Sequence, residues 1–364
     1  MHGHRRSTAA LPGKRVVGTA TLTLTRVLVL VTENAGRLLD ERADRVEPVV
    51  EQVRMQRDGR LTIDGSEVDA GAVQPEVAFA TGDMFFRGGA APWFELLLSL
   101  ESLRWFQSPA AGYIALYYRL FERGVRVTGA HVNAIPIAEY VIQGVLAHFQ
   151  RAQEWAAARA AHEWRPHEFR EVYGTTWLVI GVGSIGSAVA ERARALGARV
   201  LGHRRRPTGR EPVDEMLPRE ALLDELPRCD VVVLAAPATP ETAAFVDDRF
   251  LAAMGPDSVL VNVARGALVD EAALLAALDR GRPAAAILDV FATEPLPADS
   301  PFWEHPRVVL TPHSSAGGLA RHGRLAELFV ENLERYRNAQ PLLHEVRPAT
   351  GESTSTWLDE RARS

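Results

Sequence analysis

The sequence predicts an α/β protein of two domains, each organised around a largely parallel sheet. The chain has 364 residues, more than one hydrophobic core usually fills at about 150 residues per domain. Short apolar runs alternate with helical segments from residue 26 to residue 313. Because strands separated by helices pair in parallel, each half of the chain should contain a helix-covered sheet, with a cleft between the two domains.

The composition excludes several classes of protein. Hydrophobic residues make up 47% of the chain and charged residues 24%, as in ordinary globular proteins. The net charge of −5 and the even spread of arginines give no basic surface, so we expect no nucleic-acid partner. No apolar stretch approaches the ~20 residues that span a bilayer, and we expect a soluble, cytoplasmic protein without membrane contact. The single cysteine, Cys229, precedes an apolar run and should be a buried structural thiol.

In the N-terminal half, three apolar runs are typical of buried strands, and one segment between them is typical of a helix. The strands are expected at Arg26–Val31, at Val77–Ala80 and around Leu103–Phe106, and the helix at Pro92–Leu100. Polar sequence fills the interval to about residue 70.

Both ends of the chain, residues 1–25 and 348–364, are expected to be disordered tails. A targeting segment is the alternative for residues 1–25, although they contain no cleavable apolar core.

Between the two halves, the apolar residues from Ile137 to His148 follow helical spacing and predict a long helix. A polar arm, Arg151–Arg165, follows the helix and carries Trp155 and Trp164. Large aromatic side chains on a polar arm need a partner surface, either within the chain or on a second subunit. The sequence leaves these two alternatives open.

Beyond Thr176, strands and helices alternate densely enough to form one complete doubly wound sheet. The amphipathic segment Leu319–Arg337 then predicts a single C-terminal helix. The strand-like runs of this half are TWLVIG, ARVLG, DVVVLAA, SVLVNVA, AAAILDV and RVVLTPH.

A glycine-rich turn joins the first of these strands to a helix. Gly181 permits the tight turn that ends the strand, and Gly183 lets the backbone approach a pyrophosphate. Gly186 lets the helix pack against the strand, so that the N–H groups of Ser184 and Ile185 face the phosphates. A methyltransferase or a plain turn can share this spacing, but the strand before it and the helix after it favour dinucleotide binding.

The end of the second strand bears on the choice of cofactor. Arg199–Gly202 is not followed by the acidic residue that accepts hydrogen bonds from the ribose of NAD. Arg204 and Arg205 stand there instead, and guanidinium groups can fork onto a phosphate. The turn therefore favours NADP(H), with NAD(H) possible; a solvated basic turn is the other interpretation.

Three residues with chemistry of their own follow strands of the same predicted sheet: Arg265, Glu294 and His313. Because the carboxyl ends of parallel strands share one edge, these side chains should converge near the glycine-rich turn. A guanidinium can hold the carboxylate of a 2-oxo acid and polarise its ketone. An imidazole beside a carboxylate can protonate the alkoxide left by hydride attack. Taken singly, each residue could equally belong to an ordinary surface or turn.

The chain resembles the D-isomer-specific 2-hydroxyacid dehydrogenases, in the branch that contains glyoxylate and hydroxypyruvate reductases. The resemblance covers about residues 75 to 345 and implies that Arg265 binds the substrate. It implies that His313 is the general acid/base and that Glu294 is the carboxylate paired with it. The motifs that carry it are GVGSIG, VNVARG, LDVFATEPLPADSPFWEHP and TPHSS, with AEYV at Ala138–Val141.

The resemblance also implies further contacts. It assigns Ala111 and Gly112 to the substrate, together with Arg265 and His313, and puts Asp289 near the nicotinamide carboxamide. It implies that a cofactor loop and the strand end beneath the nicotinamide contain Pro237, Thr242, Val263 and Ala264.

One loop departs from many relatives, which have Gly-Val-Asp where this chain has Ala110–Tyr113. The departure leaves the identity of the substrate open. Met84–Arg87 and Trp303 either line a pocket for a bulkier 2-oxo acid or pack in the core.

The resemblance implies a flavodoxin-like substrate domain of residues 26–130 and 319–345, and a dinucleotide-binding domain of residues 131–318. It further implies a homodimer formed through the long helix and its arm. The predicted function is hydride transfer between NADP(H) or NAD(H) and a small 2-oxo/2-hydroxy acid of D configuration, such as glyoxylate or hydroxypyruvate. We expect no metal. A dinucleotide-sensing scaffold of the same fold, which would bind cofactor with negligible turnover, and a methyltransferase are the alternatives.

Overall fold

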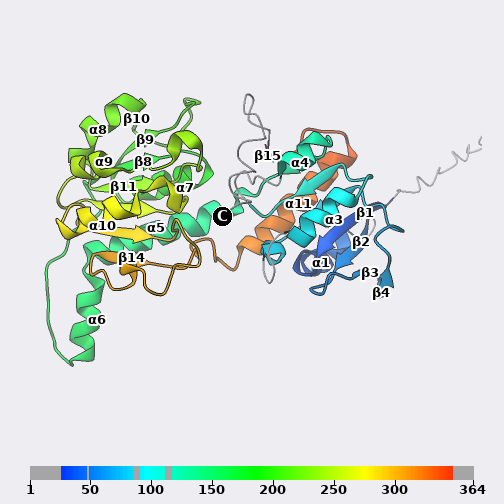
Figure 1. Cartoon of the computed structure of the whole chain (residues 1–364), viewed down its shortest axis with the longest axis horizontal. Coiled ribbons are helices and arrows are strands. Elements are labelled where there is room, and N and C mark those ends of the chain that lie inside the picture. The colour runs from blue at the N-terminus through cyan, green and yellow to red at the C-terminus, as the bar shows by residue number, and fades with distance from the viewer. Residues whose placement is uncertain (1–25, 47–48, 86–90, 111–116, 347–364) are drawn as a thin grey trace, which may run out of the picture.

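The computed structural model of the chain describes residues 26–46, 49–85, 91–110 and 117–346 (Figure 1). Its strands form two separate sheets, one from the N-terminal half with residues 345–346 added and one from residues 176–310. The predicted α/β class is therefore confirmed. The two expected tails lie outside the described residues.

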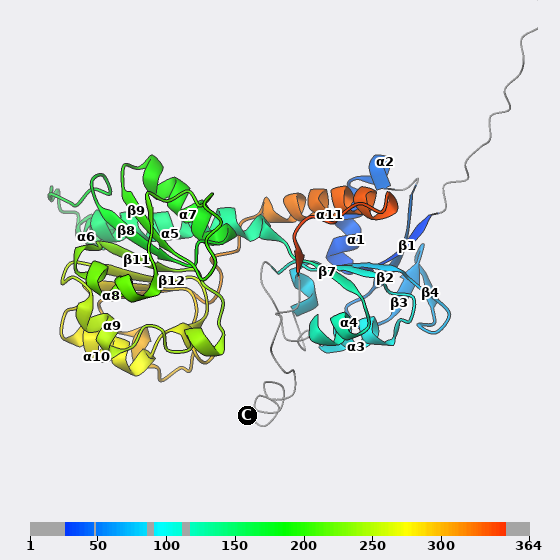
Figure 2. The same ribbon diagram turned by 90° about the horizontal axis from the view of Figure 1, so that it is seen from above.

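The first sheet has parallel central strands and antiparallel edges (Figure 2). The three strands expected in this half are present. In spatial order the strands are β15 (Glu345–Val346), β7 (Arg126–Thr128), β6 (Trp105–Gln107), β5 (Val77–Phe79), β1 (Val27–Thr32), β2 (Val50–Met55), β3 (Leu61–Ile63) and β4 (Ser66–Val68).

The polar interval before residue 70 contains three strands that the sequence analysis missed, β2, β3 and β4. β2 pairs with β1, and it buries Val50 and Val53 while Glu51 stays exposed. A strand that buries only part of its residues has a mostly polar composition, so its apolar signal is weak.

Helices from both ends of the chain cover the first sheet. The C-terminal helix α11 (Arg321–Arg337) packs on the face that includes β5 and β6, where the Phe329 ring stacks on Phe79 at 4.4 Å and on Trp105 at 5.3 Å between ring centroids. Asn332 Nδ2 donates to Gln107 Oε1 at 3.1 Å. The other helices are α1 (Glu33–Asp40), α2 (Ala43–Val46), α3 (Ala91–Ser99) and α4 (Tyr117–Glu122).

The second sheet is parallel throughout and contains all six predicted strands and a short edge strand, β10. The chain moves outward from β8 through β9 and then returns to β11, so the direction of winding switches between β8 and β11. In spatial order the strands are β10 (Glu215–Met216), β9 (Arg199–His203), β8 (Thr176–Ile180), β11 (Val231–Leu234), β12 (Val259–Asn262), β13 (Ala285–Leu288) and β14 (Val308–Leu310).

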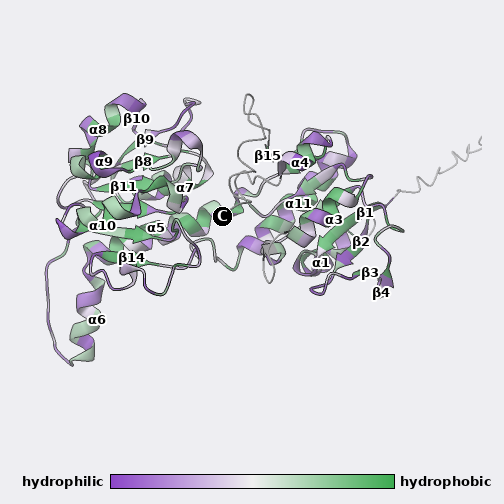
Figure 3. Ribbon diagram, in the orientation of Figure 1, coloured by the Kyte–Doolittle hydropathy of each residue, from purple (hydrophilic) through white to green (hydrophobic). Residues whose placement is uncertain are grey.

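Helices sandwich this second sheet because its strands are apolar on both faces, as the hydropathy colours show (Figure 3). Val179 faces the layer of α5 (Ala134–Phe149) and α7 (Ser184–Ala195). Ile180 faces the layer of α8 (Leu222–Glu225), α9 (Asp248–Ala253) and α10 (Glu271–Asp279). Short 3-10 turns complete the described elements, at Gly82–Phe85, His131–Asn133, Arg219–Ala221, Leu226–Arg228, Pro240–Thr242, Gly266–Leu268 and Pro301–Trp303.

The predicted long helix is α5, and its arm is a separate helix, α6 (Ala152–Ala160). The chain bends between them at Arg151, whose φ is 56°. Trp155 stacks on His167 with ring centroids 4.8 Å apart, whereas Trp164 is 98% exposed. Of the two tryptophans, Trp155 therefore has an aromatic partner within the chain.

Cys229 is buried, as predicted, and its Sγ–H donates to the carbonyl oxygen of Glu225 at 3.2 Å. Burial raises the pKa of this thiol to about 12, so it is an inert structural group. Within the described ranges, no helix combines the length and the apolar character needed to cross a bilayer.

The stacking of Phe329 on Phe79 and Trp105 gives a stability prediction. Phe329→Ala should lower the free energy of unfolding by about 3–5 kcal/mol, because it empties a buried site that two aromatic rings line. Chemical denaturation would measure the loss. Glu331→Ala on the same helix is the control, and a comparable loss there would contradict the assignment of Phe329 to the core.

Candidate active site

The glycine-rich turn follows β8 at the point where the winding of the second sheet switches. Gly181 has φ +98°, and a Cβ on it would lie 2.3 Å from the Ala236 nitrogen. A Cβ on Gly183 would instead meet no heavy atom within 4 Å. The N–H groups of Ser184 and Ile185 begin α7 and cannot pair within the helix. The open side of Gly183 and these donors fit a diphosphate, as a bound dinucleotide requires.

The two arginines after β9 stand in different surroundings. Arg204 Nη1 donates to Glu211 Oε1 at 3.0 Å, and the Glu211 side chain is only 2% exposed. The backbone N–H of Thr208, at 2.7 Å, is the main cause that lowers the pKa of Glu211 to about 2, and Arg204 adds to the shift. Arg205 is exposed and contributes to the lowered pKa of Glu241, for which the Thr239 hydroxyl is the main cause. Arg204 is thus partly neutralised, whereas Arg205 faces the neighbouring loop.

That neighbouring loop follows β11, across the switch point from Gly181. Thr242 Oγ1 donates to the Pro237 carbonyl at 2.8 Å, and Thr239 N donates to Thr242 Oγ1 at 2.7 Å. Two hydrogen bonds therefore fix the short Pro240–Thr242 turn. Val263 and Ala264 are buried at the end of β12, beside this loop.

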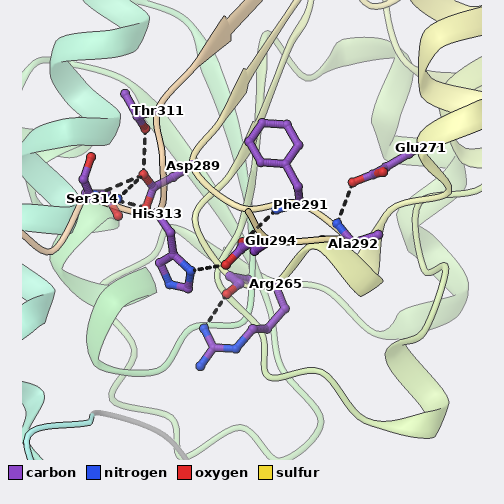
Figure 4. A network of polar contacts seen from close by, with 11 residues as sticks. Arg265, Glu271, Asp289, Phe291, Ala292, Glu294, Thr311, His313 and Ser314 are labelled. Atoms are coloured by element: carbon purple, nitrogen blue, oxygen red, sulfur yellow. Dashed lines mark hydrogen bonds and ion pairs between the residues drawn. The ribbon is translucent and has the colours of Figure 1, made fainter. Parts of the chain in front are cut away.

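His313 and Glu294 form a close pair at the ends of β14 and β13 (Figure 4). His313 Nδ1 lies 2.7 Å from Glu294 Oε2, and Glu294 Oε1 accepts from the Phe291 N–H at 3.0 Å. A carboxylate can only accept, so Nδ1 carries the proton of this bond. Both side chains are partly exposed, and Nε2 is the imidazole nitrogen left for a ligand.

Arg265 follows β12 and lies on the same side of Glu294 as the imidazole ring (Figure 4). Its Nη1 donates to the Ala264 carbonyl at 2.7 Å, and Asn262 Nδ2 donates to the Arg265 carbonyl at 3.0 Å. A Cβ on Gly266 would lie 1.9 Å from the Phe291 carbonyl carbon, so only glycine lets the two strand ends approach. No carboxylate of the described residues forms an ion pair with the guanidinium, which leaves it available to an anion.

Asp289 is 1% exposed and accepts hydrogen bonds from within the protein. Its donors are Thr311 Oγ1 at 2.6 Å and the backbone N–H groups of Ser314 at 2.8 Å and Ser315 at 3.1 Å. Tyr140, which the sequence analysis did not single out, lies behind them with its hydroxyl 2.8 Å from Thr311 Oγ1. The contact of Asp289 with a nicotinamide carboxamide stays a prediction.

The substrate residues are only partly visible. Ala111 and Gly112 lie outside the described residues, as do Phe86 and Arg87. Met84 is buried in the core of the first domain. Trp303 is half-exposed and donates through Nε1 to the Pro297 carbonyl at 2.8 Å.

A doubly wound sheet with this glycine turn is typical of a dinucleotide-binding domain. A model of the NAD binding domain of the D-isomer specific 2-hydroxyacid dehydrogenases matches residues 142–315. Glyoxylate/hydroxypyruvate reductase A of Serratia proteamaculans is 38% identical over 178 residues, 49% of this chain and 57% of that protein. D-3-phosphoglycerate dehydrogenase of Mycobacterium tuberculosis is 35% identical over 243 residues, 65% of this chain and 46% of that protein.

A D-isomer specific 2-hydroxyacid dehydrogenase from Xanthobacter autotrophicus, crystallised with NADPH and MES, superposes with a TM-score of 0.73 at 29% identity. That superposition covers 90% of this chain and 100% of the other. Residues 142–315 belong to the D-isomer-specific 2-hydroxyacid dehydrogenase family, as the motifs predicted, and the chain as a whole is similar to members of that family. Within the family it is similar to the glyoxylate/hydroxypyruvate reductase A branch, although the alignments span about half the length of the curated relatives.

Proposed function

We propose that the protein transfers a hydride between NADP(H), or less readily NAD(H), and a small 2-oxo/2-hydroxy acid of D configuration such as glyoxylate or hydroxypyruvate. The bond of 2.7 Å between His313 Nδ1 and Glu294 Oε2 carries the proposal. It holds an acid/base group at the same sheet edge as the glycine turn and Arg265. An ordinary surface histidine needs neither a paired carboxylate nor a neighbouring guanidinium.

The chemistry of reduction follows from these residues. The bound nicotinamide supplies the hydride that adds to C2 of the 2-oxo acid. Arg265 holds the substrate carboxylate and polarises the ketone, which draws electron density toward its oxygen. Glu294 keeps the proton of the neutral imidazole on Nδ1 and stabilises the imidazolium, so Nε2–H gives its proton to the developing alkoxide. The product is the 2-hydroxy acid, and His313 is left neutral.

The names of similar proteins support the reaction class and leave the substrate a proposal. One relative is named a glyoxylate/hydroxypyruvate reductase and another a D-3-phosphoglycerate dehydrogenase. The compounds in these names are carboxylic acids that carry an oxo or hydroxyl group on the carbon next to the carboxylate. The site needs only that shared group, because Arg265 and His313 address the carboxylate and the neighbouring oxygen.

His313→Ala should lower kcat/KM for glyoxylate by about 10²–10⁴-fold, the usual worth of a positioned acid/base. NADPH oxidation, followed at the nicotinamide absorbance, measures the loss. His305→Ala is the matched control, because that imidazole lies before β14, where it accepts from the Arg307 N–H at 3.2 Å and lies 3.4 Å from the Asp279 carboxylate. Nearly full activity in His313→Ala would end the assignment.

The same assay separates the enzyme from a dinucleotide-sensing scaffold. The unmodified protein is tested with a panel of 2-oxo acids and both reduced cofactors, and cofactor binding is measured in parallel by fluorescence. Binding without turnover of any substrate would support the scaffold.

NADP(H) is proposed as the preferred cofactor because Arg204 and Arg205 follow β9 without an acidic residue at its end. A structurally similar dehydrogenase was crystallised with NADPH. Replacing both arginines by glutamine should raise the KM for NADPH about tenfold or more, since charge-assisted hydrogen bonds to a phosphate are lost. The KM for NADH should change by less than about twofold. Arg210→Gln, in the same loop, is the control; equal effects on both cofactors would refute the phosphate role.

A homodimer is proposed through α5 and the α6 arm. Along the exposed face of α5, Ile142 and Leu146 line an open groove, and Trp164 on the arm is 98% exposed. Exposed apolar side chains of this size are typical of subunit contacts. Light scattering should give about twice the chain mass of 39.9 kDa. Trp164→Ala should shift the protein toward monomer, whereas Trp303→Ala should not; a monomeric unmodified protein would contradict the proposal.

A further inference from the structure

A line of polar groups, of which Asp289 is buried and the other two are partly buried, runs beneath the His313 loop, which we define as residues 311–315. Tyr140 on α5 begins the line, Thr311 stands in the middle and Asp289 ends it, with oxygen–oxygen distances of 2.8 Å and 2.6 Å. The proposed hydride transfer uses neither Tyr140 nor Thr311. The helix that carries Tyr140 is also the one by which the chain passes from the first sheet to the second (Figure 2).

The direction of the hydrogen bonds in this line follows from the groups themselves. The Asp289 carboxylate can only accept, so the single hydroxyl hydrogen of Thr311 points to it. The oxygen of Thr311 then has only lone pairs to offer, and the Tyr140 hydroxyl donates to it. Burial is the main cause that raises the pKa of Tyr140; the bond with Thr311 opposes the shift and the charge of Asp289 adds to it, so the phenol keeps its hydrogen. Where water is partly excluded, such a chain of bonds strengthens each member.

Asp289 holds both sides of His313. Its backbone carbonyl accepts from the His313 N–H at 2.8 Å, and its side chain accepts from the N–H groups of Ser314 and Ser315. His313 itself has φ 50°, in the left-handed region that a residue with a Cβ adopts only where its surroundings impose it. The bonds to Asp289 supply that constraint. They turn the backbone so that the ring reaches Glu294 (Figure 4).

We propose that Tyr140 and Thr311 are positioning residues that fix the Asp289 carboxylate, and through it the His313 loop, in the shape that pairs the imidazole with Glu294. The inference rests on the proposed function for the catalytic role of His313. It differs from the expectation that Asp289 chiefly contacts the nicotinamide. Each side-chain oxygen of Asp289 already accepts from the His313 loop.

The two interpretations predict different kinetics for Thr311→Val, which removes a donor to Asp289 at little change in volume. If the line positions His313, kcat should fall by about 10- to 100-fold, because small misplacements of a reacting group cost this much. The KM for NADPH should stay within about twofold. If Asp289 instead binds the nicotinamide and the loop is unaffected, the KM for NADPH should rise and kcat should change less than KM does. That result would overturn the proposal.

Conservative variants separate hydrogen bonding from packing. Thr311→Ser keeps the hydroxyl and should restore most of kcat, whereas a merely structural loss of the threonine methyl group would persist. Tyr140→Phe should lower kcat by a few-fold, and the double variant with Thr311→Val should cost no more than Thr311→Val alone, since both act on one chain of bonds. Additive losses in kcat would contradict a single line of hydrogen bonds. Tyr336→Phe is the matched control, because its hydroxyl donates to Glu76 at 3.1 Å in the first domain.

A spectroscopic readout tests the inference without turnover. In the cofactor-free protein, ¹⁵N spectra of the imidazole should show His313 as the Nδ1–H tautomer, and Thr311→Val should mix the two tautomers. An unchanged tautomer in a variant that melts at the normal temperature would overturn the proposal. If the unmodified protein reduces no 2-oxo acid, the proposed function fails, but this spectrum still decides whether the line orients the imidazole.

Discussion

The candidate site depends on one constraint, the parallel pairing of all the strands in the second sheet. Parallel strands end at the same edge, so loops that are far apart in the chain are brought together there. The direction of winding reverses between β8 and β11, next to the glycine turn, and doubly wound sheets bind their ligands at such a switch point. Arg265, Glu294 and His313 come from three different strand ends, and an antiparallel pairing at any one of them would have removed its residue from the site.

Electrostatics then distinguishes residues of the same type. Arg204 is bonded to the nearly buried Glu211, whereas Arg265 has only a carbonyl partner in the described part of the chain. Arg204 is therefore held in its loop and partly neutralised, whereas Arg265 keeps its full charge for an anion. Likewise, Asp289 is buried and bonded to the His313 loop, whereas Glu294 is partly exposed and bonded to the imidazole. Two carboxylates at neighbouring positions thus have separate tasks.

The first domain is closed by the end of the chain. Phe329 of α11 stacks between Phe79 and Trp105, and β15 pairs with β7, so residues beyond 320 complete a core begun at residue 27. The helices α5 and α11 both lie where the chain crosses between the two sheets (Figure 2). Tyr140 lies on α5, so a helix by which the chain crosses between the sheets also contacts the His313 loop, through the Thr311 hydroxyl.

The sequence by itself determined the α/β class, the six strands of the second sheet, the glycine turn and the three residues at its strand ends. These follow from local signals: apolar runs, glycine spacing and the position of a residue just after a strand. The tertiary structure alone decided the three polar strands β2, β3 and β4 of the first sheet, the bend at Arg151, and the partners Glu211 and Tyr140. Those features depend on which distant side chain supplies a hydrogen bond or a buried surface, and the periodicity of the sequence does not encode such long-range partners.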